Sequence, residues 1–192
     1  MNELTDDLET EESVDMGSLN HSAIQVNLAY LLKCLGTFSV YTELSLDTSS
    51  LDKTRYKFRE EIQPDVCIYP KRGLSRPYDI LKMSEMPLLA IEVVSPKQAL
   101  QDIGDFKIKA IPMKSLDPLQ KALEVERFFA MDIVEKIDAY FALGVRSCWM
   151  IDPTTAIVLV YRSLEDKTIF TSGEVIDDVI GIRLPFDDIF DA

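Results

Sequence analysis

One glutamate stands inside the most apolar run of the chain. Glu92 separates Leu-Leu-Ala-Ile at 88–91 from Val-Val at 93–94. Such a run is expected to form a buried strand, where an ionised carboxylate carries a desolvation cost. Glu92 should therefore have a partner: a cation, several hydrogen-bond donors or a metal ion. If Glu92 has no functional role, it would either form a buried ion pair or point to solvent from an edge strand.

A second carboxylate, Asp65, opens another short apolar strand and directly follows Pro64. Alone it is ordinary, because aspartate is common at strand starts and in turns. If the two strands pair, the carboxylates of Asp65 and Glu92 can point to one side of the sheet. Converging carboxylates repel each other unless a divalent cation lies between them, as in oxygen-ligated Mg²⁺ sites.

A lysine on a later helix is the third candidate. Asp132, Lys136 and Tyr140 recur every four residues, so they share one stripe of the helix expected over 132–143. The adjacent stripe is apolar and should face the sheet: Ile133, Ile137 and Phe141. Lys136 would then reach a carboxylate site from the edge of the buried face. The alternative is a solvated lysine paired with Asp132.

Two carboxylates on adjacent strands and one lysine suit the metal-assisted hydrolysis of a phosphodiester. The metal polarises the phosphate and lowers the pKa of a bound water. The lysine orients that water or stabilises the charge that develops.

The chain has 192 residues, which predicts one domain with a real core. Apolar residues at helical spacing predict a helix over 19–35, capped by Ser18 or Asn20 and closed by Gly36. A further helix is expected near 118–130. Strands are expected over 38–44, 53–59, 64–70, 87–94, 148–151, 156–161 and 167–171. This order predicts an α/β fold with a mixed sheet flanked by helices.

These motifs resemble the PD-(D/E)xK nuclease superfamily, which has a restriction-endonuclease-like core. Its acidic pair matches Pro64-Asp65 and Glu92. Most members carry a lysine two residues after the glutamate, where this chain has Val94. The Uma-two family of endonucleases tolerates that departure, because its lysine lies on the following helix.

The chain is similar to the Uma-two family over about residues 18–190, and His21 matches a frequent histidine of its first helix. The matching motifs, in order, are Pro64-Asp65, Glu92-Val93-Val94-Ser95-Pro96, Asp132 with Lys136, Tyr140, Gly144-Val145, Trp149 and Asp152-Pro153.

The resemblance implies a Mg²⁺-dependent DNA endonuclease, with Mn²⁺ as an alternative cation. The carboxylates of Asp65 and Glu92 and the backbone carbonyl of Val93 would bind the metal. Lys136 would act as a general base or stabilise charge, with His21, Asp132 and Tyr140 as accessory residues. The sequence does not fix the oligomeric state, and a homodimer is considered because many nucleases that cut duplex DNA act as dimers.

One departure from the family concerns chain length after the glutamate. The family has an aspartate about ten residues after it, which is Asp102 here, and Asp132-Ile133 repeats Asp102-Ile103 thirty residues later. We interpret 103–132 as an insertion before the second core helix of a domain spanning 18–192. Lys107 is therefore a rival to Lys136. An insertion that obstructs the site would leave a catalytically inactive binding or interaction module, which is the alternative function.

A net charge of −13 argues at first sight against a nucleic-acid substrate. Its distribution weakens the objection: residues 1–15 contribute −7 and residues 174–192 contribute −5, which leaves −1 for the rest. We expect residues 1–17 to be a flexible acidic tail. The basic residues proposed to contact DNA alternate along the expected strand and follow the Asp65 strand: Lys53, Arg55, Lys57, Arg59, Lys71 and Arg72. A solvated hairpin face is the alternative for them.

Several classes of protein are disfavoured. The three cysteines are widely spaced and the chain has one histidine, so a zinc site or a disulfide framework is not expected. No glycine-rich turn suggests a nucleotide-cofactor enzyme. The start of the chain has no apolar signal core, and no apolar run approaches a membrane span of roughly 20 residues. We therefore expect a cytoplasmic protein without a membrane partner.

The charge distribution gives a first prediction. Removing residues 1–15 should strengthen DNA binding at low salt, because the acidic tail repels phosphate. Gel-shift titrations of the full and trimmed chains at two salt concentrations would measure this. Equal affinities at low salt would show that the tail does not suppress binding.

Overall fold

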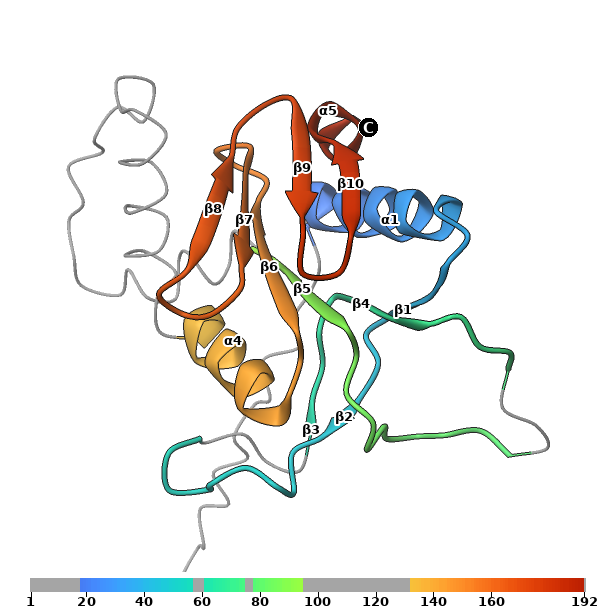
Figure 1. Ribbon diagram of the computed structural model, residues 1–192, viewed down its shortest axis with the longest axis vertical. Coiled ribbons are helices and arrows are strands. Elements are labelled where there is room, and N and C mark those ends of the chain that lie inside the picture. The colour runs from blue at the N-terminus through green and yellow to red at the C-terminus, as the bar shows by residue number, and fades with distance from the viewer. Residues whose placement is uncertain (1–17, 57–60, 75–77, 95–131, 192) are drawn as a thin grey trace, which may run out of the picture.

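A computed structural model describes residues 18–56, 61–74, 78–94 and 132–191 (Figure 1). The expected acidic tail, the helix near 118–130 and nearly all of the proposed insertion over 103–132 lie outside these residues. So do three of the candidate basic residues: Lys57, Arg59 and Lys107.

A six-stranded mixed sheet forms the centre of the molecule, in the order β1-β4-β5-β6-β7-β8. Only β5 and β6 run parallel; the other neighbours in this sheet are antiparallel. The strands are β1 (Phe38–Thr42), β4 (Val66–Pro70), β5 (Leu89–Val93), β6 (Ser147–Asp152), β7 (Ile157–Tyr161) and β8 (Lys167–Phe170). The predicted α/β class with a mixed sheet is confirmed.

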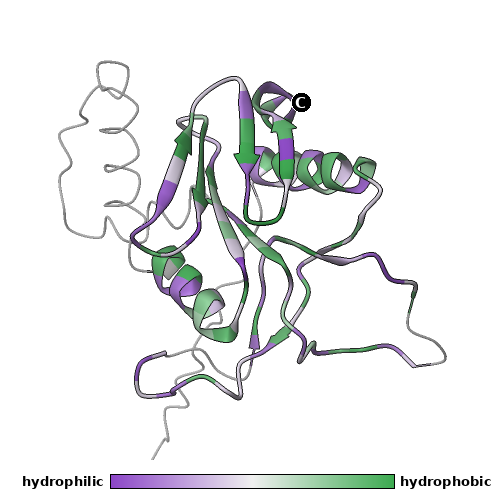
Figure 2. Ribbon diagram, in the orientation of Figure 1, coloured by the Kyte–Doolittle hydropathy of each residue, from purple (hydrophilic) through white to green (hydrophobic). Residues whose placement is uncertain are grey.

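The two longer described helices pack in different hydrophobic clusters of the sheet. Helix α1 (Leu19–Cys34) buries Ile24, Leu28 and Leu32 in one cluster. Helix α4 (Asp132–Leu143) places Ile133 and Ile137 in the other. Figure 2 shows hydrophobic residues along the central strands and polar residues in the loop that follows β2.

Smaller elements surround this core. They are the paired strands β2 (Leu46–Asp47) and β3 (Glu61–Ile62), the hairpin of β9 (Glu174–Asp177) and β10 (Ile182–Pro185), and helix α5 (Phe186–Phe190). The sequence patterns do not predict β9, β10 or α5, because each of these elements is only four or five residues long.

The ends of α1 follow from local chemistry. The hydroxyl of Ser18 accepts a hydrogen bond from the backbone N–H of His21 at 3.3 Å, so Ser18 is the N-cap. Gly36 follows the helix with a φ of 73°, a left-handed conformation that costs glycine little. Both expected signals are confirmed, with Ser18 rather than Asn20 as the cap.

The predicted strand over 53–59 is wrong in its described part. Residues 53–55 form a turn, in which the backbone N–H groups of Arg55 and Tyr56 both donate to the carbonyl of Asp52, at 3.1 and 2.9 Å. The Asp52 carboxylate also accepts from the backbone and hydroxyl of Thr54. Aspartate and threonine here favour a turn over the β-propensity of the alternating residues. Lys53 and Arg55 therefore do not share a strand face, although Tyr56 is buried as expected.

A buried carboxylate attaches the β9–β10 hairpin to the main sheet. Asp177 accepts hydrogen bonds from the hydroxyl of Ser147 at 2.6 Å and from the indole N–H of Trp149 at 2.8 Å. Both donors belong to β6, and all three residues are buried. The hairpin is therefore held in place by paired polar groups as well as by apolar contacts.

Replacing this carboxylate should destabilise the protein. We expect Asp177→Ala to lower the free energy of unfolding by about 2–4 kcal/mol, because it leaves two buried donors without an acceptor. The neighbouring, exposed Asp178 provides a matched control, and Asp178→Ala should change stability by less than about 0.5 kcal/mol. Urea denaturation would measure both, and equal effects would contradict the prediction.

Candidate functional site

The register of two strands brings the two predicted carboxylates together. Strands β4 and β5 are antiparallel, and Val66 pairs with Ile91. The next position along this register sets Asp65, just before β4, opposite Glu92 near the end of β5. The expectation that these strands pair is confirmed.

Glu92 is almost completely buried and has two donors from α4. Its side chain is 4% exposed. The ammonium group of Lys136 lies 3.0 Å from Oε2, and the hydroxyl of Tyr140 donates to Oε1 at 2.6 Å. The two donors are one helical turn apart, so both reach the same carboxylate. The sequence prediction that Glu92 needs a partner is therefore confirmed.

Burial is the main influence on the ionisation of Glu92. Removal from water raises the pKa of this carboxyl group, and the nearby Asp65 raises it further, while Lys136 and Tyr140 oppose the rise. Burial and the adjacent Glu92 also raise the pKa of the Tyr140 hydroxyl well above its ordinary value. Tyr140 therefore remains a hydrogen-bond donor at neutral pH.

Asp65 contacts both β5 and α1. Its Oδ2 accepts a hydrogen bond from the backbone N–H of Val93 at 2.6 Å, and Oδ1 lies 3.1 Å from Nε2 of His21. Its side chain is 19% exposed, so the carboxylate is partly accessible to solvent. His21, Asp65, Glu92, Lys136 and Tyr140 thus form one continuous cluster.

Two further residues reach this cluster and are missed by the sequence analysis. The amide of Gln25 donates to the backbone carbonyl of Asp65 at 2.9 Å, and the backbone N–H of Glu43 approaches the same oxygen at 3.3 Å. Glu43 follows β1 with a φ of 52°, which is uncommon outside glycine. The Gln25 position, four residues after His21, is the only sequence signal that points to either residue.

The donor chemistry of this cluster fits a hard divalent cation. Carboxylate and carbonyl oxygens are the ligands that Mg²⁺ prefers, and one or two carboxylates suffice because the ion keeps several waters. The N–H of Val93 donates to Asp65, and a strand residue directs its N–H and C=O to the same side, so the Val93 carbonyl is expected on the β4 side of β5. Among the described residues, no group of three His, Cys, Asp or Glu side chains could hold a metal, so a backbone oxygen and waters would complete the shell.

The remaining accessory candidates are less informative. Asp132 is the first residue of α4, and Lys107 lies outside the described residues. Val94, at the position of the usual superfamily lysine, is buried in the α4-side cluster.

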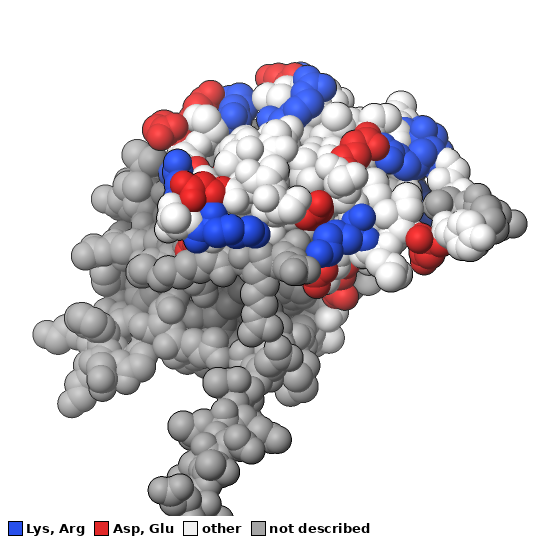
Figure 3. All heavy atoms as spheres, turned by 90° about the horizontal axis from the view of Figure 1, so that it is seen from below, with Lys and Arg blue, Asp and Glu red and all other residues white. Residues whose placement is uncertain are grey.

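The candidate DNA-contacting residues that the structure describes are engaged with the protein itself. Arg55 forms a 2.6 Å ion pair with Asp138 of α4, and Lys53 donates to the backbone and hydroxyl of Thr48 at 3.1 Å. Arg72 binds both carboxylate oxygens of Glu85, at 3.0 and 2.9 Å. On the face seen in Figure 3, described basic and acidic side chains are interspersed.

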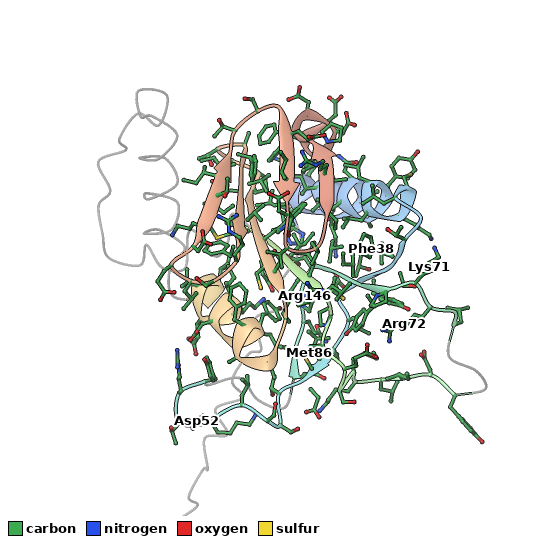
Figure 4. All side chains as sticks on the ribbon, in the orientation of Figure 1. Phe38, Asp52, Lys71, Arg72, Met86 and Arg146 are labelled. Atoms are coloured by element: carbon green, nitrogen blue, oxygen red, sulfur yellow. The ribbon has the colours of Figure 1, made fainter. Side chains whose placement is uncertain are left out.

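The basic residues after β4 lie far from the acidic cluster. Lys71 and Arg72 follow the end of β4, whereas Asp65 precedes its start, so about 20 Å of extended chain separates them. Figure 4 shows both side chains on the opposite side of the view from α4. The four described candidates therefore do not form one surface around Asp65 and Glu92.

The comparisons with known proteins agree with the geometry. A model of the Uma2 family, described as "Putative restriction endonuclease", matches residues 9–185. A crystal structure described as "a putative nuclease belonging to DUF820", from Anabaena variabilis ATCC 29413, superposes with a TM-score of 0.58 at 17% identity, over 91% of this chain and 82% of that chain. No curated protein matches the sequence significantly. Within the described ranges, no helix has the length and apolar character needed to span a bilayer.

The raised pKa of Glu92 predicts a pH-dependent stability. A carboxyl group whose pKa is higher in the folded chain contributes stability that is fully present below its ordinary pKa of 4.5 and is lost as the pH rises through the folded value. Glu92→Gln cannot ionise, so the variant should gain stability relative to the wild type as the pH rises above 4.5. Urea denaturation across pH 4.5–8 would measure the difference.

The exposed Glu174, which pairs with Arg183, supplies the control for that measurement. Glu174→Gln should show no such gain with rising pH. A Glu92→Gln difference that does not vary with pH would contradict a raised pKa.

Proposed function

Since the chain belongs to the Uma2 family of restriction-endonuclease-like proteins, we propose that it is a divalent-metal-dependent endonuclease that hydrolyses phosphodiester bonds of DNA. One observation carries the proposal. Asp65 and Glu92 are opposed on adjacent strands, with the ammonium group of Lys136 3.0 Å from Glu92. Acidic oxygens and a cation in one cluster are what metal-assisted attack on a phosphate requires.

In this proposal, the metal ligands are the carboxylates of Asp65 and Glu92 and the backbone carbonyl of Val93. Mg²⁺, or Mn²⁺ in its place, would polarise the phosphate and lower the pKa of a bound water. Each carboxylate oxygen already accepts one protein contact, from His21, Val93, Lys136 or Tyr140. An ionised carboxylate has about four lone-pair sites, so these contacts orient the oxygens and leave capacity for a cation.

Lys136 has two roles in the proposed reaction. It compensates the buried charge of Glu92 and, because its side chain is 26% exposed, it can also approach a bound phosphate. An ammonium group in contact with a carboxylate carries a positive charge, which favours stabilisation of the developing negative charge over a role as general base. Tyr140 holds the other oxygen of Glu92 and does not need to contact DNA.

DNA contacts outside the acidic cluster should be weak. The described basic candidates all have protein partners, and the net charge of the chain is −13. We therefore expect a modest affinity that rests on the cation bound at the site.

The alternative is a catalytically inactive nuclease fold that serves as a binding or interaction module. One observation favours it: Lys136 and Tyr140 already satisfy both oxygens of Glu92 without a metal. A site of this kind can be stable on its own, with no requirement for a cation.

A cleavage assay separates the two. With Mg²⁺ or Mn²⁺ the wild type should cleave plasmid DNA, and chelation should abolish cleavage. Glu92→Ala should remove activity, and Lys136→Met should lower the rate by about 10²-fold because a stabilising cation is lost. Lys33→Met is the matched control, since this exposed lysine lies about three turns further along α1 than His21.

A defined negative result would overturn the endonuclease proposal. If plasmid, linear and single-stranded DNA all remain intact with either cation, and Glu92→Ala changes nothing, the endonuclease proposal fails. A Ca²⁺ titration by calorimetry then tests the inactive alternative, which predicts no heat that depends on Glu92.

A further inference from the structure

The amide of Gln25 contacts the main chain of Asp65 from α1. Its Nε2 donates to the Asp65 carbonyl at 2.9 Å and lies 3.4 Å from Oε1 of Glu43. The backbone N–H of Glu43 approaches the same carbonyl at 3.3 Å. These contacts join α1, the end of β1 and the residue before β4 in one small network.

Helix α1 contacts Asp65 at two places. His21 lies four residues before Gln25, so the two side chains are on the same face of the helix. His21 meets the carboxylate of Asp65 at 3.1 Å, whereas Gln25 meets its carbonyl. A rotation or shift of Asp65 would therefore break at least one contact with α1.

Asp65 needs such support because of its position. Strand β4 begins at Val66, and the described pairing with β5 ends at Val66 and Ile91. Just beyond the ladder with β5, the backbone carbonyl of Asp65 is held on the β1 side by the N–H of Glu43 at 3.3 Å and by the amide of Gln25 at 2.9 Å. Groups that act in catalysis must be held within about 0.5 Å of their productive positions by the residues behind them.

We propose that Gln25 is a positioning residue that holds Asp65 in place for the reaction. Gln25 acts through Asp65 and contacts neither DNA nor the attacking water. Its use in catalysis rests on the proposed function, whereas the fixed position of Asp65 does not. An uncharged amide suits this place, because a carboxylate there would face the Asp65 carbonyl and the Glu43 carboxylate.

Asn27 offers a matched control on the same helix. Its amide also donates to backbone carbonyls, those of Ile189 at 3.2 Å and of Asp191, but these belong to α5 and the residue after it. Gln25→Ala and Asn27→Ala therefore remove the same chemical group from α1. Only the first removes a contact with Asp65.

Cleavage kinetics give the first measurement. Gln25→Ala should lower kcat by about three- to tenfold, the effect of one hydrogen bond, and raise the Mg²⁺ concentration for half-maximal rate, with KM for DNA unchanged. Asn27→Ala should lower thermal stability and leave both kinetic quantities unchanged. Equal kinetic effects of the two variants would show that Gln25 supports only the fold and would overturn the proposal.

The second measurement does not depend on activity. The chain contains a single histidine, so the imidazole NMR signals of His21 report on its contact with Asp65. Gln25→Ala should shift these signals, and the shift should vanish in an Asp65→Ala background, as in a double-mutant cycle. Asn27→Ala should leave the imidazole signals of His21 unshifted.

The two measurements separate the proposals. An unchanged imidazole signal in Gln25→Ala overturns the positioning of Asp65, whether or not the wild type cleaves DNA. If the wild type cleaves nothing and the signal shifts only while Asp65 is present, Gln25 does position Asp65, and only its catalytic use fails with the proposed function; a shift that persists in the Asp65→Ala background overturns the positioning.

Discussion

The structure depends on how the carboxylate of Glu92 is kept inside an apolar sheet. An unpaired buried charge would cost several kcal/mol, which is a large part of the stability of a domain. Lys136 and Tyr140 offset this cost from adjacent turns of α4. Moving α4 by one turn along the sheet would separate both donors from the carboxylate, so the ion pair also selects the position of the helix.

The second carboxylate is held in a different way. Asp65 lies at the rim of the sheet, where its partly exposed side chain contacts α1 and the backbone of β5. One carboxylate is thus buried and compensated by charge, and the other is accessible and oriented by hydrogen bonds. The two acids are therefore opposed on adjacent strands but have unequal surroundings and unequal access to solvent.

The sequence predicts the parts of the site that interrupt a strong pattern. Glu92 stands out because it breaks an apolar run, and α4 has the bounds that its periodicity predicts, 132–143. Gln25 and Glu43 break no pattern. The pairing of β1 with β4 brings Glu43 to Asp65, and the packing of α1 against the sheet brings Gln25 there. The strand expected over 53–59 is wrong in its described part because a local aspartate turn outweighed the alternation of side chains. Local signals therefore predict the strands and helices, whereas the support of Asp65 depends on contacts with residues 40 and 44 positions away, Gln25 and His21.

The parallel pairing of β5 and β6 has a consequence for how this chain can change in length. Parallel neighbours need a crossover of a dozen or more residues, and here it runs from Val94 to Arg146 and contains α4. The free energy of closing such a connection grows only with the logarithm of its length, by about 0.6 kcal/mol for each doubling. The register of β5 against β6 is set by the pairing of these two strands and does not depend on the length of the connection between them. Residues can therefore be gained or lost ahead of α4 at little thermodynamic cost, provided that α4 still delivers its lysine and tyrosine to Glu92.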